Sequence, residues 1–128
     1  MRILLDTHIA LWALSNHVRL SPMARRYLVD PANEIHVSAA SVWEIAIKHG
    51  KNPAVMPIDP DDAIAAFAES GFRMLEISAL HAAATRRLPL LHQDPFDRLL
   101  LAQAISEPMT FLTADHVLEA YSDLVVMV

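Results

Sequence analysis

The 128-residue sequence contains no cysteine, which excludes disulfide scaffolds, thiolate zinc sites and cysteine nucleophiles. Only two residues are glycine and 6% are aromatic, so the chain is neither fibrous nor low in complexity. Excess positive charge is also lacking. The formal net charge of −5 argues against a broad electrostatic surface for nucleic acid, although it leaves room for a small basic patch or a metal-bridged contact to phosphate.

Long hydrophobic runs are absent as well. The apolar start of the chain meets Asp6 too early for a signal peptide or a membrane span, so we expect a soluble cytoplasmic protein with no membrane partner. Hydrophobic residues nevertheless make up 54% of the chain and charged residues 20%, which excludes a disordered chain and is enough for a real core. We expect one domain over residues 1–128.

Short apolar runs alternate with amphipathic segments along the whole chain. The apolar runs predict five buried strands: Arg2–Leu5, Glu34–Val37, Arg73–Ile77, Met109–Thr113 and Leu124–Val128. Helix-start signals lie between them at Ser21-Pro22, Asp59-Pro60, Ser78 and Asp94-Pro95, and the helix after Ser78 is expected to run to about Arg87. This alternation predicts an α/β fold with a central, mostly parallel five-stranded sheet and helices on both faces.

Four acidic residues fall where such a sheet would gather them. Asp6 and Asp115 follow predicted strands directly, Asp97 lies in the first turn of a helix, and Glu44 lies in an otherwise apolar helix that follows the second strand. In open parallel sheets, ligand chemistry collects beyond the carboxyl ends of the strands. We therefore expect these carboxylates to converge there.

Each acid also has an ordinary structural explanation. Asp6 or Asp115 can cap a helix, Asp94 before Pro95 is a standard cap, and Asp97 is favoured by the helix dipole. Glu44 can pair with Lys48 one turn on. Taken together, however, four converging acids would repel one another and raise their own pKa values. A divalent cation removes that repulsion, and carboxylate ligands without cysteine select Mg²⁺ or Mn²⁺. Such ions activate water and polarise phosphoryl groups, which indicates phosphodiester hydrolysis.

The segments that carry these acids resemble the PIN-domain ribonucleases, and within them the VapC-like toxins of bacterial toxin–antitoxin pairs. The resemblance spans essentially the whole chain and rests on four blocks in order: Leu4-Leu5-Asp6-Thr7-His8, Val37-Ser38-Ala39-Ala40-Ser41-Val42-Trp43-Glu44-Ile45-Ala46-Ile47-Lys48, Asp94-Pro95-Phe96-Asp97-Arg98-Leu99-Leu100-Leu101-Ala102-Gln103-Ala104 and Leu112-Thr113-Ala114-Asp115.

The resemblance implies a PIN-like fold and an Mg²⁺-dependent endoribonuclease, with Mn²⁺ as a substitute, that cleaves RNA as the toxin of such a pair. It also implies a homodimer silenced by a cognate antitoxin. By the same resemblance, the catalytic, metal-binding acids are Asp6, Glu44, Asp97 and Asp115. Thr113 would orient this acid cluster and Thr7 would do the same. Asp94 is an extra acid of the Asp-Pro-Phe-Asp subgroup.

Histidine and basic residues give weaker signals. His8 and His92 lie close in sequence to acids and are expected at the mouth of the site, although a metal-activated water makes a histidine base unnecessary. Arg98, next to Asp97, is a candidate for an RNA phosphate contact or a salt bridge within the site. Lys48 shares a helix face with Glu44, so an ion pair and an RNA contact are both open.

Two other functions fit parts of the pattern. A non-catalytic α/β binding module would keep the acids only as helix caps. A phosphoaspartate phosphatase or receiver would also place an aspartate after its first strand. The phosphatase pattern, however, needs a second aspartate two residues after Asp6, where this chain has His8.

Overall fold

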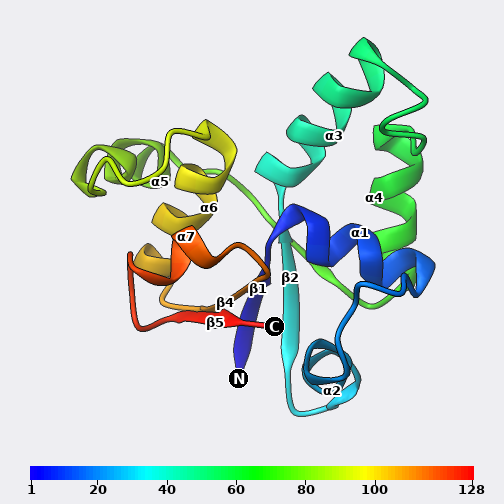
Figure 1. Cartoon of the computed structure of the whole chain (residues 1–128), viewed down its shortest axis with the longest axis horizontal. Coiled ribbons are helices and arrows are strands. Elements are labelled where there is room, and N and C mark those ends of the chain that lie inside the picture. Colours follow the sequence, from blue (N-terminus) through cyan, green and yellow to red (C-terminus); the bar gives the residue numbers. More distant parts are fainter.

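The computed structural model describes residues 1–128, and its elements alternate as expected (Figure 1). The strands are β1 (Arg2–Leu5), β2 (Glu34–Ser38), β3 (Arg73–Leu75), β4 (Thr110–Thr113) and β5 (Val125–Met127). The helices are α1 (Thr7–Ser15), α2 (Pro22–Val29), α3 (Ala39–Lys51), α4 (Pro60–Glu69), α5 (Ala79–Ala84), α6 (Pro95–Ser106) and α7 (His116–Glu119), with a 3₁₀ turn η1 (Thr85–Arg87) after α5.

The five strands form one sheet in the order β3-β2-β1-β4-β5, with β1 in the centre. All four strand pairings are parallel, and Ile3 of β1 lies beside both Ile35 and Thr110. The predicted α/β fold is therefore confirmed. Because the strands run in the same direction, their carboxyl ends lie at one edge, where Asp6 follows β1 and Asp115 follows β4.

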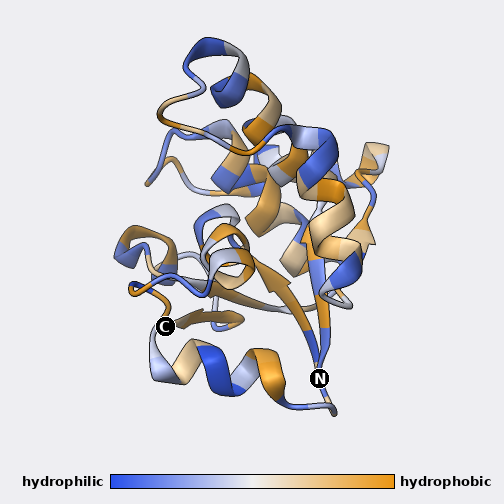
Figure 2. Cartoon of the chain, turned by 90° about the vertical axis from the view of Figure 1, so that its right-hand side faces the viewer, coloured by the Kyte–Doolittle hydropathy of each residue, from blue (hydrophilic) through white to orange (hydrophobic).

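Helices cover both faces of the sheet, as the sequence predicts. Alternate residues of β1 point to opposite faces: Ile3 and Leu5 join one buried cluster and Leu4 joins another. The first cluster takes side chains from α1, α2, α3 and α4, and the second takes them mainly from α5, α6 and α7. The central strands are correspondingly hydrophobic in Figure 2. None of the helices combines the length and the apolar character needed to cross a membrane.

Most helix starts follow the predicted capping residues. The Ser21 hydroxyl accepts from the Ala24 N–H, and the Ser78 hydroxyl accepts from the His81 N–H. The Asp94 carboxylate accepts from the N–H groups of Phe96 and Asp97, which fixes the start of α6. These bonds satisfy N–H groups that have no partner inside the helix.

Several predicted elements are shorter in the structure: β4 and β5 lack one or two terminal residues of the predicted strands, and β3 and α5 also end early. The strand predicted to reach Ile77 ends at Leu75, and the carbonyl of the next residue, Glu76, accepts a side-chain hydrogen bond from Gln103. The helix predicted to reach about Arg87 ends at Ala84 and continues as the 3₁₀ turn η1. There the Thr85 hydroxyl bonds to the Ala82 carbonyl, and Pro89 soon prevents further helix.

Candidate active site

Asp6 occupies the N-cap position of α1, yet its side chain makes no capping hydrogen bond. The carboxylate is buried and instead accepts a 2.6 Å hydrogen bond from the Thr113 hydroxyl. Burial raises the pKa of Asp6, and the bond from Thr113 and the nearby His8 only partly oppose this. The ordinary capping explanation for Asp6 thus fails, and its carboxylate is held at the sheet edge by β4.

Glu44 is buried to the same extent as Asp6. Its residue is 4% exposed, and one carboxylate oxygen lies 2.5 Å from the Lys48 ammonium. The other oxygen, Oε1, is buried and has no hydrogen-bond partner. Burial alone would lower the pKa of Lys48, but the contact with Glu44 outweighs it and the pKa is raised. The predicted ion pair is therefore present, and it leaves one carboxylate oxygen unused.

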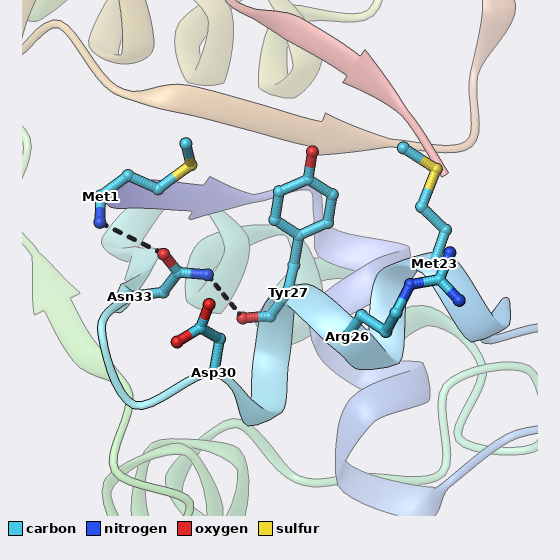
Figure 3. A pocket seen from close by; sticks show the side chains of 6 residues that line it. All are labelled: Met1, Met23, Arg26, Tyr27, Asp30 and Asn33. Atoms are coloured by element: carbon cyan, nitrogen blue, oxygen red, sulfur yellow. Dashed lines mark hydrogen bonds between the residues drawn. The ribbon is translucent and has the colours of Figure 1, made fainter.

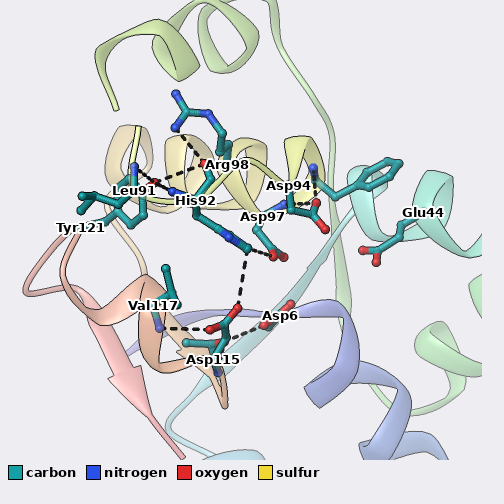
Figure 4. Close-up of polar contacts among 12 residues, drawn as sticks. Asp6, Glu44, Leu91, His92, Asp94, Asp97, Arg98, Asp115, Val117 and Tyr121 are labelled. Carbon is teal, nitrogen blue, oxygen red and sulfur yellow. Dashed lines mark hydrogen bonds and ion pairs between the residues drawn. The ribbon is translucent and has the colours of Figure 1, made fainter. Parts of the chain in front are cut away.

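Asp97 and Asp115 lie on either side of one imidazole ring. The Nε2 atom of His92 lies 2.7 Å from Asp97 Oδ2 and 3.7 Å from Asp115 Oδ2 (Figure 4). The other oxygen of Asp115 accepts from the Val117 N–H and caps α7. Asp115 therefore caps a helix and faces the cluster at the same time.

The electrostatics of the cluster are those of crowded carboxylates. Burial raises the pKa of Asp97 to about 7, and the negative charge of Asp6 adds to the effect, while the hydrogen bond from His92 opposes it. The bond to Asp97 raises the pKa of His92. Glu44 further raises the pKa of both Asp6 and Asp97. The acids are thus close enough to repel one another, as the sequence argument requires.

A cavity of about 290 Å³ opens at this edge of the sheet and brings together residues from four parts of the chain. Its lining consists of Asp6, His8, Trp12, Arg19, Asp97, Ala114 and Asp115. Glu44 lies outside this lining, but its carboxylate points toward the same cluster (Figure 4). The arrangement is a negatively charged pocket with carboxylate oxygens directed inward.

The two threonines of the site have different contacts. Thr113 bonds directly to Asp6, and its oxygen also accepts from the Asp115 N–H, so one hydroxyl links two of the acids. Thr7 bonds to the Ser41 hydroxyl at 2.8 Å and so joins the start of α1 to α3, the helix that carries Glu44. The Thr7 hydroxyl bonds to Ser41 and not to an acid, whereas the Thr7 backbone N–H acts on Asp6 and lowers its pKa.

Arg98 has a structural role in this arrangement. Its guanidinium donates to four backbone carbonyl groups of the segment before α6, at Thr85, Leu88, Pro89 and His92. These bonds engage the donors that an RNA phosphate or an acid of the cluster would need. An RNA contact by Arg98 stays a prediction, and it would require the exchange of some of these bonds.

The position of His92 between two acids is not evident from the sequence, which places it only at the mouth of the site. The Tyr121 hydroxyl accepts from the backbone N–H groups of Leu91 and His92, and the ring itself bonds to Asp97. Tyr121 lies 29 residues away from His92 in sequence. The short spacing from His92 to Asp97 is the one local signal that could have indicated this contact.

A second hollow lies beside α2, away from the acids (Figure 3). It is lined by Met1, Met23, Arg26, Tyr27, Asp30 and Asn33. The amino group of Met1 bonds to the Asn33 side chain, which in turn donates to the Tyr27 carbonyl. With a single carboxylate and no buried titratable group, this hollow lacks the donor set found at the sheet edge.

Comparison with known proteins agrees with this geometry. Residues 3–124 match the PIN domain model. The chain is 32% identical over 120 residues to Ribonuclease VapC22 of Mycobacterium tuberculosis, an alignment that covers 93% of this chain and 91% of that protein. It also superimposes on a chain in the crystal structure of VapBC2 from Rickettsia felis bound to a DNA fragment from their promoter, with a TM-score of 0.71 and 18% identity, over 100% of this chain and 98% of that one. The protein is therefore a VapC-like member of the PIN-domain family.

Proposed function

We propose that this protein is a divalent-metal-dependent endoribonuclease, the toxin of a toxin–antitoxin pair, with Asp6, Glu44, Asp97 and Asp115 as its catalytic, metal-binding acids. The family and the likeness to Ribonuclease VapC22 support the class of activity. The observation that carries the proposal is the unpartnered, buried Oε1 of Glu44, directed at a pocket of carboxylates. A buried carboxylate oxygen without a partner is costly, and a cation would satisfy it.

The residues fit a hard divalent cation. All four acids offer oxygen donors, and neither this cluster nor the rest of the chain offers a thiolate. Mg²⁺ and Mn²⁺ prefer such ligands, and the mutual repulsion of the acids would be relieved by a bound cation. When bound, the metal would supply Lewis-acid polarisation of a phosphoryl oxygen and a water of lowered pKa.

The surrounding side chains prepare the acids for this chemistry. Thr113 orients Asp6, and the Thr7–Ser41 bond fixes α1 against α3. Lys48 neutralises one oxygen of Glu44, and its side chain is 40% exposed. Its ammonium therefore stands at the edge of the cluster, where a phosphate of single-stranded RNA would meet it. Asp94 serves chiefly as the cap of α6.

We further propose an antitoxin protein as the partner of this chain. The Rickettsia felis neighbour is a VapBC2 complex, which supports a partner of that kind. The net charge of −5 favours an antitoxin segment rich in basic residues, because a cationic side chain would neutralise the acid cluster. Homodimer formation and a cytoplasmic location remain predictions.

The test is cleavage of single-stranded RNA by the purified chain with Mg²⁺, with Mn²⁺ and with EDTA. We expect cleavage only with metal, and Asp6→Asn should abolish it while the fold is kept. The matched control is Asp62→Asn, because Asp62 is an exposed acid in the first turn of α4. Cleavage that persists in EDTA, or in Asp6→Asn, would overturn the proposal. Metal-linked stabilisation without cleavage would indicate a binding module instead.

A further inference from the structure

His92 is the one nitrogen donor within reach of two acids of the cluster. Its Nε2 lies 2.7 Å from Asp97 and 3.7 Å from Asp115, and the donor atoms of the three residues all lie within 4.8 Å of one another. Figure 4 shows the ring pointing into the space between the two carboxylates. His92 itself does not line the 290 Å³ cavity, whereas His8 lines that cavity but does not belong to this group of three.

The backbone of His92 is fixed from two sides. The Tyr121 hydroxyl accepts from its N–H at 2.7 Å and from the N–H of Leu91 at 3.1 Å. Arg98 donates to the His92 carbonyl and to the carbonyls of Leu88 and Pro89. A ring carried by a segment held in this way is positioned in advance, as a metal ligand needs to be.

We propose that His92 Nε2 is a metal ligand together with Asp97 and Asp115, which makes this part of the site a mixed nitrogen–oxygen centre; the inference rests on the proposed metal-dependent function. The 2.7 Å separation of His92 Nε2 and Asp97 Oδ2 is close to the spacing of about 3 Å between adjacent ligands at about 2.1 Å from one octahedral ion, and the 3.7 Å to Asp115 lies between this and the spacing of about 4.2 Å for opposite ligands. The buried, unpartnered Oε1 of Glu44 is a separate sign that the cluster accommodates a cation.

A nitrogen ligand changes which ion the site prefers. Mg²⁺ favours oxygen ligands and retains its waters, whereas Mn²⁺ accepts an imidazole nitrogen more readily. Transition-metal ions to the right of manganese in the first row bind imidazole more tightly than Mn²⁺ does. The site should therefore bind Mn²⁺ more tightly than Mg²⁺. Loss of the imidazole should affect Mn²⁺ far more than Mg²⁺, since a water can take the place of the ring on Mg²⁺.

The test is metal binding by the purified full chain, followed through the signal of free Mn²⁺ in electron paramagnetic resonance and through competition by Mg²⁺. In His92→Ala we expect Mn²⁺ affinity to fall at least about tenfold and Mg²⁺ affinity to change less than about threefold. His49→Ala is the control and should match the wild type, because His49 bonds to the Met56 carbonyl and does not line the cavity. Pulsed measurements on the wild type should detect coupling of Mn²⁺ to an imidazole nitrogen, and this coupling should vanish in His92→Ala.

Tyr121→Phe separates positioning from ligation. It removes the hydroxyl that holds the His92 backbone but keeps the ring, so we expect weakened Mn²⁺ binding with the nitrogen coupling retained. Equal Mn²⁺ affinity in His92→Ala and the wild type, or no nitrogen coupling in the wild type, would overturn the ligand role while leaving the nuclease proposal intact. Tighter binding in His92→Ala would also overturn it, because the ring would then obstruct the site. A wild type that binds no metal and cleaves no RNA would instead overturn the proposed function.

Discussion

The hydroxyl of Thr113 donates a 2.6 Å hydrogen bond to Asp6, although 107 residues separate them in sequence. The bond joins the carboxyl ends of β4 and β1, which are neighbours in the sheet. The same hydroxyl oxygen accepts from the Asp115 N–H. The buried Thr113 side chain thus bonds to both Asp6 and Asp115, the first and the last acid of the candidate site.

Thr113→Val should therefore weaken both the fold and the site. It keeps the shape of the side chain but leaves the Asp6 carboxylate and the Asp115 N–H without their partner, which costs about 1–3 kcal/mol of unfolding free energy. Urea unfolding measures this loss. Thr113→Ser keeps the hydroxyl and is expected to retain most of the stability. A Thr113→Val protein as stable as the wild type would contradict the importance of the bond.

Removal of Lys48 should destabilise the metal-free protein. Glu44 would then be a buried carboxylate with no counter-ion, and breaking a fully buried pair costs about 3–5 kcal/mol. Because the Lys48 side chain is 40% exposed, we expect a smaller loss, about 1–2 kcal/mol, for Lys48→Met. Lys51→Met, at the exposed end of the same helix, should cost little. If Glu44 binds metal, Mn²⁺ should restore part of the loss in Lys48→Met; equal stability of the two variants would contradict the pairing.

Stability of the metal-free protein should fall as the pH rises toward neutrality. Burial raises the pKa of Asp97 from 3.8 to about 7, so between these values the folded state binds more protons than the unfolded state. The unfolding free energy then decreases as the pH rises through this window. The raised pKa of His92 acts in the same direction. Thermal unfolding across this window should show the decline in the wild type and a weaker decline in Asp97→Asn. The same dependence of stability on pH in the wild type and in Asp97→Asn would show that the pKa of Asp97 is not raised.

The stability that the His81–Glu107 pair contributes should depend on pH in the opposite sense. The hydrogen bond from His81, at 2.7 Å, lowers the pKa of Glu107 below its ordinary 4.5. Glu107 therefore contributes stability above the pKa of the unfolded state, and this is lost as the pH falls through the lower folded value. In urea unfolding at decreasing pH, the stability difference between wild type and Glu107→Gln should shrink below about 4.5. If the stability difference between the wild type and Glu107→Gln did not depend on pH, the His81 bond would not lower the pKa of Glu107.

Much of the fold follows from local signals in the sequence. Ser-Pro and Asp-Pro pairs fix the starts of α2, α4 and α6, because each places a capping oxygen just before a residue with helical φ. Apolar runs without alternation predict strands covered on both faces. Convergence of Asp6 and Asp115 follows from the parallel direction of the strands, which requires only that β1 and β4 lie in one sheet.

The features of the site that could not be predicted from the sequence depend on contacts between distant segments. Asp6 avoids its expected capping bond because Thr113 reaches it from β4, and no pattern around Asp6 encodes that choice. The four carbonyls that accept from the Arg98 guanidinium belong to an irregular segment, so these partners could not be predicted from the sequence either. Tyr121 holds the His92 backbone and Asp97 bonds to the His92 ring, and contacts in such loops have no periodicity to predict them.

The central place of β1 also determines when the pocket can exist during synthesis. Thr113 of β4 lies 107 residues after Asp6, so β4 can insert beside β1 only after that whole stretch has been translated. An incomplete chain therefore holds its acids apart. Asp6 and Glu44 are therefore present in the nascent chain long before the cleft that contains Asp97 and Asp115 can form around them.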